Sequence, residues 1–234
     1  MTDRSTALIT GASAGLGLAL TRTLIGRGWR VIGTARRADR LDLVHEELGE
    51  RFRALPGDIT DPGHREELAE IVSGATGLGL VVNNASRLGP SPLPKLADYP
   101  LGELEQVYRT NVVAPLAVLQ FTLPLLRAGH GVAVNVSSDA AVEPYPEWGG
   151  YGSSKAALDQ LTAILAAEHP DVPIYAFDPG DMRTEMHQAA FPGDDISDRP
   201  EPETVVPALL RLVESRPKPG RYTAADFATG AVRR

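Results

Sequence analysis

The chain has 234 residues, of which 43% are hydrophobic and 23% charged, the balance of an ordinary globular protein. This length suits one α/β domain better than two, so we expect a single domain over residues 1–234. A formal net charge of -7, with no run of basic residues longer than a pair, argues against a nucleic-acid partner. The sequence contains no cysteine, which excludes disulfides and cysteine-ligated metals.

No targeting or membrane-spanning segment is recognisable in the sequence. The first ten residues lack a basic leader followed by an apolar stretch. Nowhere do about 18 apolar residues follow one another without a charge. We therefore expect a cytoplasmic protein that is neither exported nor embedded in a membrane.

Short β-rich runs alternate with segments of helical period, which is typical of βαβ units. The predicted strands cover residues 6–10, 30–35, 52–55, 78–83, 131–136, 173–177 and 221–223. The predicted helices cover residues 15–27, 39–51, 62–73, 102–127, 152–168 and 203–214. Pro115 and Pro124 should break or bend the fourth helix. About seven parallel strands flanked by helices predict a doubly wound α/β sheet of the Rossmann type, with ligands outside the carboxyl ends of its strands.

A glycine-rich turn follows the first predicted strand and opens a helix, so its backbone N–H groups face a phosphate. Its spacing, G-x-x-x-G-x-G, differs from the G-x-G-x-x-G fingerprint, but the glycines allow the same tight turn and close approach to a pyrophosphate. Taken alone, the turn leaves open a βα connection that binds nothing. The residues expected at a dinucleotide here are Gly11, Ser13, Ala14, Gly15, Leu16 and Gly17.

The end of the second predicted strand bears on which dinucleotide binds. An NAD-binding fold presents Asp or Glu to the ribose 2′-hydroxyl about 20 residues beyond the glycine turn. Here the strand ends in Ala35-Arg36-Arg37, and a guanidinium suits a 2′-phosphate. The two arginines also suit a solvated helix N-terminus, and Asp39 lies close by. We favour NADP(H) over NAD(H), with Arg36 and Arg37 at its phosphate.

Tyr151 and Lys155 stand four residues apart at the start of a predicted helix, which places them on one face. A free tyrosine titrates near pH 10, and a cation within about 4 to 6 Å favours the phenolate. Lys155 supplies such a charge. An isolated Tyr-x-x-x-Lys also occurs as an ordinary surface pair, so the motif needs its context.

That context is a set of motifs in a fixed order. Asn83-Asn84-Ala85 follows the fourth predicted strand, Ser138 precedes Tyr151 by thirteen residues, and Pro179-Gly180 follows the sixth strand. Together with the glycine turn, they make the chain resemble the short-chain dehydrogenase/reductase family from Thr6 to about Thr223. The resemblance implies an NADP-preferring enzyme of the carbonyl reductase type, which moves a hydride between the nicotinamide and a carbonyl or alcohol.

The same resemblance implies roles for individual residues. Tyr151 is then the general acid/base, and Lys155 lowers its pKa and holds the nicotinamide ribose. Ser138 hydrogen-bonds the substrate oxygen, and Asn111 anchors a water in the proton relay. The further cofactor contacts that it implies are Asp58 and Ile59 at the adenine, Asn84 and Ala85 at the ribose, and Pro179, Gly180, Met182 and Thr184 after the sixth strand, with Thr184 at the carboxamide.

One position departs from the family pattern. The family's Asn-Asn-Ala-Gly ends here in Ser86, which adds a Cβ and a hydroxyl near the cofactor. We expect the fold to tolerate this serine. Tyr145 and Trp148 suit either a pocket wall or loop packing, and the five histidines form no ligand-spaced cluster. We therefore predict no catalytic metal.

Residues 185–202 have the composition of a substrate lid. Their first half can form a short helix with an apolar side, and Pro192-Gly193 then breaks it. A static surface loop is the alternative. Two further functions stay open beside the reductase, namely an epimerase or dehydratase that keeps its cofactor, and a non-catalytic nucleotide-binding regulator. The partners that we expect are a small carbonyl or alcohol and other copies of the chain, as a homotetramer or homodimer.

Overall fold

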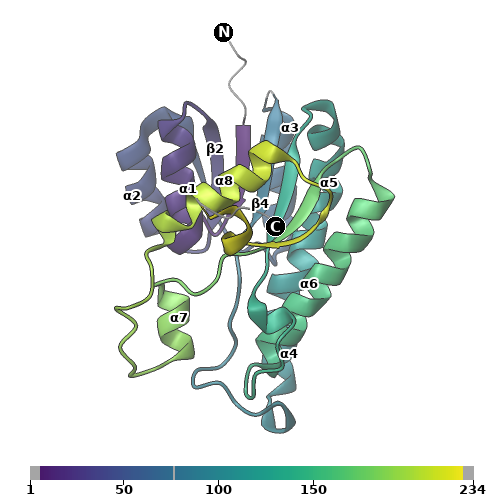
Figure 1. The fold of residues 1–234 in the computed structure, drawn as a ribbon. Helices are drawn as coiled ribbons and strands as arrows, with labels where there is room; N and C mark the ends of the chain where they lie inside the picture. Colours follow the sequence, from purple (N-terminus) through teal and green to yellow (C-terminus); the bar gives the residue numbers. More distant parts are fainter. Residues whose placement is uncertain (1–5, 76, 229–234) are drawn as a thin grey trace.

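The computed structural model describes residues 6–75 and 77–228. Seven parallel strands form one sheet in the order β3-β2-β1-β4-β5-β6-β7 (Figure 1). The strands are β1 (Thr6–Thr10), β2 (Arg30–Ala35), β3 (Phe52–Pro56), β4 (Leu78–Asn83), β5 (Val132–Val136), β6 (Ile174–Asp178) and β7 (Gly220–Thr223). The strand order reverses between β1 and β4, where a doubly wound sheet opens its ligand crevice. The predicted fold class is confirmed, and the predicted strand bounds differ by no more than one residue.

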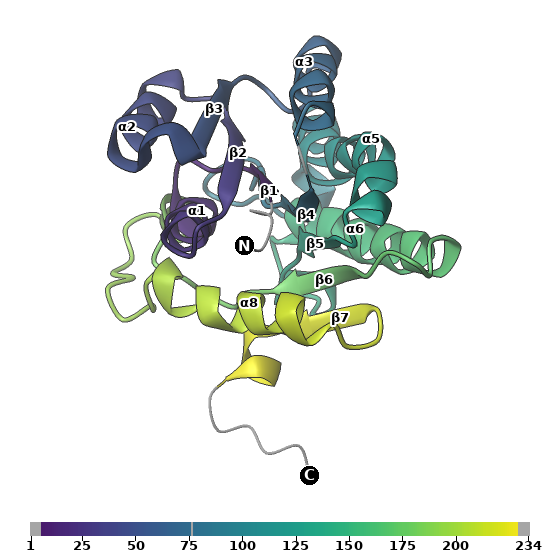
Figure 2. The same cartoon turned by 90° about the horizontal axis from the view of Figure 1, so that it is seen from above.

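Two helical layers cover the sheet, one on each face (Figure 2). One layer contains α1 (Gly15–Gly26), α2 (Ala38–Leu48) and α8 (Val206–Ser215). The other contains α3 (Pro62–Ser73), α5 (Ala114–Ala128) and α6 (Gly149–Glu168). Every residue of β1, β5 and β6 is buried, as expected for parallel strands that have helices on both sides.

Local sequence sets where several helices begin. Asp61 accepts a hydrogen bond from the backbone N–H of Gly63, and Pro62 fills the first position of α3, the usual arrangement at a helix N-terminus. Thr184 caps the short α7 (Glu185–Ala190) by accepting from His187 N at 3.1 Å. The short helix predicted in the first half of residues 185–202 is therefore present. Helix α8 begins three residues later than predicted, after the 3-10 turn η5 (Pro202–Thr204).

The predicted break near Pro115 and Pro124 is wrong in position. The interruption is a π-helical turn, η3 (Arg109–Val113), between α4 (Leu101–Tyr108) and α5. Pro115 lies in the first turn of α5, where its missing N–H costs little. Pro124 lies inside α5 without ending it. The turn carries Asn111, and π-helical turns inside longer helices are frequent at functional sites.

By length and composition alone, the helical stretch Leu101–Ala128 would suffice to cross a membrane, which the sequence analysis did not anticipate. Half of its most apolar window is buried inside the fold. Val118, Leu119, Leu123 and Leu126 of this stretch belong to the core cluster that the sheet shares with α3, α5 and α6. The apolar character of the stretch is accounted for by its place in the core.

Candidate active site

A cleft of about 780 Å³ lies at the carboxyl ends of the strands. Its walls come from the segments that follow β1, β2, β3, β4, β5 and β6, together with α6 and α7. All but two of the predicted site residues line it. The exceptions are Gly17 and Asn111, which lie directly behind the lining.

At one end, the glycine turn presents the N-terminus of α1 to the cleft. Ala14 occupies the N-cap and makes no side-chain cap, and the first turn of α1 has no acidic residue. Its leading backbone N–H groups and the positive end of its dipole suit a phosphate. Gly11 has φ +70°, and a Cβ on Gly17 would lie 2.2 Å from the Gly11 oxygen. Both glycines are therefore required by this turn, and Gly17 acts through packing.

Asn84 ties the glycine turn to β4. Its Nδ2 donates to the carbonyl oxygens of Thr10 and Gly11 at 3.0 and 3.2 Å. The Thr10 hydroxyl in turn accepts from the backbone N–H groups of Asn84 and Ala85. These bonds across the switch point of the sheet hold the two cleft walls in register.

Beyond β2, the cleft wall is basic. Arg36 and Arg37 both line it, and Arg37 forms an ion pair with Glu185 of α7. Asp58 also lines this end. Burial alone would raise the pKa of the Asp58 carboxyl, but hydrogen bonds from Thr60 and the charge of Arg36 hold that pKa below its usual value. Asp58 is thus an ionised acceptor beside the site where an adenine ring is expected.

The cleft fits a dinucleotide. The uncapped helix N-terminus and side-chain-free glycines suit a pyrophosphate, and the arginines after β2 suit a 2′-phosphate. Residues that would hold a nicotinamide ribose lie at the far end, after β5 and on α6. Adjacent strands of a sheet lie about 4.8 Å apart. The three spacings from β2 to β5 therefore separate the arginine end of the cleft from the Tyr151 end by roughly 14 Å, so the cofactor has to bind in an extended form.

At this far end, Tyr151 lies in the first turns of α6 and is 9% exposed. The Trp148 ring packs edge-on against the Tyr151 ring at 5.8 Å. Burial raises the pKa of Tyr151 to about 12, although hydrogen bonding with Ser86 and Ser138 lowers it. A phenol in this state is protonated at neutral pH and is a proton donor.

Lys155 lies one turn further along α6 and is 2% exposed. Its Nζ donates to the Val136 carbonyl oxygen at 2.7 Å and lies 5.5 Å from the centre of the Tyr151 ring. Burial lowers the pKa of Lys155 to about 8, against the opposing charge of Asp159. The expected depression of the Tyr151 pKa by Lys155 is not found, because the ammonium faces the ring and strand β5 while burial of the phenol dominates.

Ser138 follows β5 and caps the 3-10 turn η4 (Asp139–Ala141). Its Oγ donates to the Asp139 carboxylate at 3.0 Å and accepts from Ala140 N at 3.2 Å. Tyr145 also donates to Asp139. Ser138 therefore lies at the cleft wall beside Tyr151, and its proton is directed to a carboxylate.

Asn111 is buried behind Tyr151, and its side-chain amide forms hydrogen bonds with other protein groups. Its Nδ2 donates to Arg87 O and Ser154 Oγ at 2.9 and 3.0 Å. Its Oδ1 accepts from Arg87 N at 2.8 Å and from Ser86 Oγ at 3.1 Å. The amide thus connects the segment after β4 with α6 and contacts the unusual Ser86.

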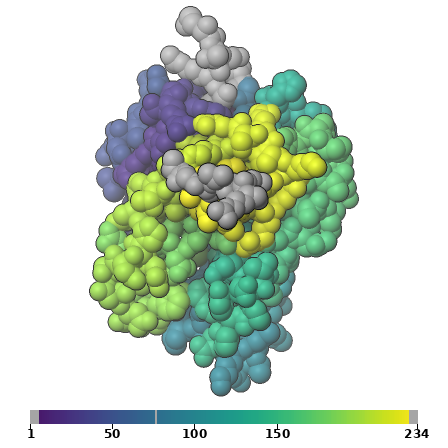
Figure 3. Space-filling model, in the orientation of Figure 1, coloured from purple at the N-terminus to yellow at the C-terminus, as the bar shows by residue number. Residues whose placement is uncertain are grey.

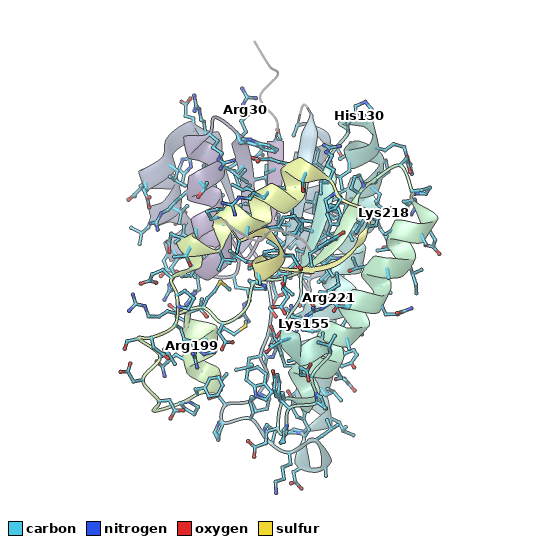
Figure 4. The ribbon with its side chains drawn as sticks, viewed as in Figure 1. Arg30, His130, Lys155, Arg199, Lys218 and Arg221 are labelled. Atoms are coloured by element: carbon cyan, nitrogen blue, oxygen red, sulfur yellow. The ribbon has the colours of Figure 1, made fainter. Side chains whose placement is uncertain are left out.

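Arg221 of β7 is a site residue that sequence analysis missed (Figure 4). It donates to the Ser138 carbonyl oxygen at 2.9 Å and pairs with Asp178 and Asp159 at 2.9 and 3.1 Å. Asp159 lies one turn after Lys155 on α6. This arginine therefore joins the ends of β5 and β6 to the helix that carries Tyr151, and no local pattern around residue 221 indicates it.

The first half of the segment 185–202 lines the cleft, through Glu185, Met186, His187, Ala190 and Phe191. The whole segment is the yellow-green part of Figure 3. Met186, Ala189 and Ala190 pack against the cluster of Leu88, Ala140 and Tyr151. The Phe191 ring lies 5.9 Å from Trp148. The base of the segment is closed by Arg183 N donating to Pro200 O at 2.9 Å. The Tyr151 ring thus has largely apolar and aromatic neighbours, while Ser86 and Ser138 lie at its hydroxyl.

Within residues 6–75 and 77–228, no group of three or more His, Asp or Glu side chains is arranged to hold a metal ion. The acidic residues near the site are held by other partners, such as Arg221 for Asp178 and Asp159.

Comparison with known proteins agrees with this geometry. The model of the short chain dehydrogenase family matches residues 5–195. The chain is 38% identical to a serine 3-dehydrogenase of Agrobacterium fabrum over 185 residues, or 77% of this chain and 73% of the relative. It is 38% identical to a probable NADP-dependent dehydrogenase of Haemophilus influenzae over 197 residues, or 82% and 77%.

A solved short chain dehydrogenase from Shigella flexneri, in complex with NADP, superposes with a TM-score of 0.88. It is 29% identical, with 96% of this chain and 98% of that chain covered. The family match spans most of the chain, and the seven-stranded sheet agrees with the fold of the solved relative. The chain therefore belongs to the short-chain dehydrogenase family of oxidoreductases.

Proposed function

We propose that the protein is an NADP(H)-dependent reductase of apolar ketones or aldehydes, with Tyr151 as the proton donor. The observation that carries the proposal is one continuous cleft with two unlike ends. Arg36, Arg37 and the α1 N-terminus line one end, and Tyr151, Ser138 and Lys155 line the other. This arrangement suits an extended dinucleotide that brings its nicotinamide to the buried phenol.

The cofactor supplies a hydride to the carbonyl carbon when it is bound. Tyr151 provides the matching proton to the carbonyl oxygen, and its O–H bond breaks as the alcohol O–H bond forms. Lys155, held by Val136 O, presents a positive charge near the phenolate that results. Ser138 can direct its hydroxyl to the substrate oxygen once it turns from Asp139.

The preference for NADP(H) is supported by two independent observations. Arg36 and Arg37 stand at the end of β2, where an NAD-binding protein would carry an acid. The Shigella flexneri protein of the same fold holds NADP, and the Haemophilus influenzae relative is described as NADP-dependent. A guanidinium binds the 2′-phosphate through charge-assisted hydrogen bonds.

An apolar substrate is favoured by the walls around Tyr151. Trp148, Phe191, Met186 and Leu88 all line the cleft there. Lys155 is the one lysine or arginine that lines this end in the described part of the chain, and it is engaged by Val136 O. A free amino acid such as serine would place its carboxylate among these apolar side chains, with no lysine or arginine of the described lining left to pair with it, at a desolvation cost.

The experiment is a substrate panel with the purified protein, following the loss of NADPH absorbance. We expect sustained turnover with aryl and alkyl ketones or aldehydes, and little oxidation of serine with NADP+. Turnover of serine at a comparable kcat/KM would reject the apolar substrate class. Conversion of a substrate without net NADPH consumption would instead indicate an epimerase or dehydratase, and no turnover of any kind would favour a nucleotide-binding regulator.

We also propose that residues 185–202 act as a lid, because their first half lines the Tyr151 end of the cleft and a backbone hydrogen bond from Arg183 to Pro200 closes their base. Self-association through the outer faces of α4, η3 and α6 is a further proposal. Leu101, Val113 and Ile164 expose 73%, 54% and 42% of their surface there, as expected for a homodimer or homotetramer. Light scattering of the purified protein measures this directly.

A further inference from the structure

Ser86, the residue that departs from the family pattern, lies between Asn111 and Tyr151. It follows β4 and lines the cleft. Its Oγ donates to Asn111 Oδ1 at 3.1 Å. Ser86, Ser138 and Tyr151 line the same end of the cleft, and interaction with the two serine hydroxyls lowers the pKa of the Tyr151 phenol against the effect of its burial. The serine thus connects a buried amide to the group that carries the reacting proton.

We propose that Ser86 is a catalytic residue, whose hydroxyl turns from Asn111 to the Tyr151 oxygen as that oxygen loses its proton. The proposal rests on the proposed role of Tyr151 as the general acid/base. A hydroxyl has one proton and two lone pairs. While its proton points to Asn111, Ser86 can accept from neutral Tyr151. After proton transfer, it can donate to the phenolate.

The contacts of Asn111 allow Ser86 to turn at low cost. Asn111 Oδ1 keeps a second donor, the Arg87 backbone N–H at 2.8 Å, so it is not left as a buried acceptor without a hydrogen bond. Asn111 Nδ2 remains held by Arg87 O and Ser154 Oγ. The Asn111 amide therefore stays in place, and only the hydroxyl proton of Ser86 has to move.

Ser138 is less free to make the same change. Its proton is donated to the Asp139 carboxylate, and a hydrogen bond to an ionised acceptor is about twice as strong as one to a neutral amide. Ser86 gives up a bond to a neutral oxygen instead. Turning the hydroxyl toward the Tyr151 phenolate therefore costs less free energy for Ser86 than for Ser138.

No proton is transferred through Ser86. The Tyr151 O–H bond breaks, and the substrate oxygen receives that proton as the hydride reaches the carbonyl carbon. Ser86 keeps its own O–H bond throughout and changes only its acceptor. Its contribution is to stabilise the phenolate, which makes Tyr151 a stronger acid in the forward direction.

The test compares pH profiles of wild type, Ser86→Ala and Ser86→Thr. A hydrogen bond to a charged group is of a size that changes a pKa by about one unit. In Ser86→Ala we expect the midpoint of the kcat profile for alcohol oxidation to rise by about one unit. At a fixed pH below that midpoint, kcat should fall roughly tenfold with little change in KM. Ser86→Thr, which keeps the hydroxyl, should restore most of the shift.

Two further variants make the result interpretable. Ser153→Ala removes an exposed hydroxyl on α6, the helix of Tyr151, which donates to Gly150 O, and it should keep the wild-type profile. Ser86→Gly, the family residue, takes the place of Ser86→Ala if that protein does not fold. Superimposable profiles for wild type and a folded Ser86 variant would overturn the proposal, as would a loss confined to KM.

Failure of the proposed function looks different. If Tyr151→Phe retains wild-type turnover, Tyr151 is not the acid/base and both proposals fall together. If Tyr151→Phe is inactive while the Ser86→Ala profile is unchanged, only the role of Ser86 is rejected.

Discussion

The Glu185 carboxylate at the start of α7 lies 2.9 Å from Nη1 of Arg37 at the end of β2. The other oxygen of the same carboxylate accepts from Arg40 at 2.5 Å. Both sides of the Arg37 pair are substantially exposed, at 44% and 61%, so its contribution to stability is small. Its position matters more, because it joins the segment 185–202 to the arginines proposed for the 2′-phosphate.

Glu185→Gln should tighten NADPH binding several-fold and leave NADH binding unchanged. The carboxylate shares the Arg37 guanidinium with the incoming 2′-phosphate and repels it, and glutamine removes that charge. Fluorescence titration gives both dissociation constants. Asp194→Asn is the matched control, since it removes an exposed acid from the same segment and does not contact Arg37. Weaker NADPH binding in Glu185→Gln would show that the ion pair supports the phosphate site instead of competing with it.

Arg36→Ala should lower the preference for NADPH over NADH by roughly tenfold. This corresponds to the lower end of the free energies of hydrogen bonds to charged groups, as expected for a pair near solvent. The change should lie in the KM or Kd for NADPH, with kcat preserved. Arg30→Ala is the control, because Arg30 stands at the opposite end of β2 (Figure 4). An unchanged cofactor ratio in Arg36→Ala would place the selectivity elsewhere.

Tyr151→Phe should lower kcat by about two to four powers of ten, the usual contribution of a general acid, while NADPH affinity stays within a few-fold of wild type. Phenylalanine keeps the ring that packs on Trp148 and removes only the proton donor. Tyr222→Phe on β7 removes a hydroxyl that donates to Lys218 O and serves as the control. Comparable turnover in the two variants would contradict the assignment.

The stability of the protein should depend on pH through Lys155. The unfolded lysine keeps its proton up to about pH 10.5 and the buried one up to about pH 8. Between these values the unfolded state binds more protons, so the free energy of unfolding rises with pH. Relative to Lys155→Met, wild type should gain on the order of 3 kcal/mol across this window and nothing below it.

Urea unfolding at pH values on either side of 8 measures this difference. Lys218→Met removes an exposed lysine and should run parallel to wild type. If the gap between wild type and Lys155→Met stays constant with pH, Lys155 has the same pKa in the folded and unfolded states.

Trypsin should cut at Arg183 and Arg199 more slowly when NADP+ and an alcohol substrate are both present. The two residues bracket most of the segment 185–202, and both are exposed and held by surface ion pairs. Closure over the ligands would add contacts that oppose local opening. Equal cleavage rates with and without ligands, read by mass spectrometry, would mean that the segment is a static wall.

The sequence by itself determined the fold and the location of most of the cleft. Buried strands such as β1 and β5 are recognisable as short apolar runs bounded by turn residues. In a parallel sheet, the segments after successive strands must meet at one edge. Motifs far apart in the chain, such as the glycine turn at Gly11 and the helix at Tyr151, therefore predict one site.

Only the tertiary structure decided how the side chains within that site act on one another. The Ser86–Asn111 bond, the Arg37–Glu185 pair and the contact of Arg221 with Ser138 join residues 25, 148 and 83 positions apart. No local pattern specifies such distances. The pKa of Tyr151 illustrates the same limit, because Lys155 at i+4 predicts a lowered value whereas the burial that raises it comes from packed neighbours such as Trp148. Helical spacing is a property of the backbone, but desolvation and hydrogen-bond partners are properties of the complete fold.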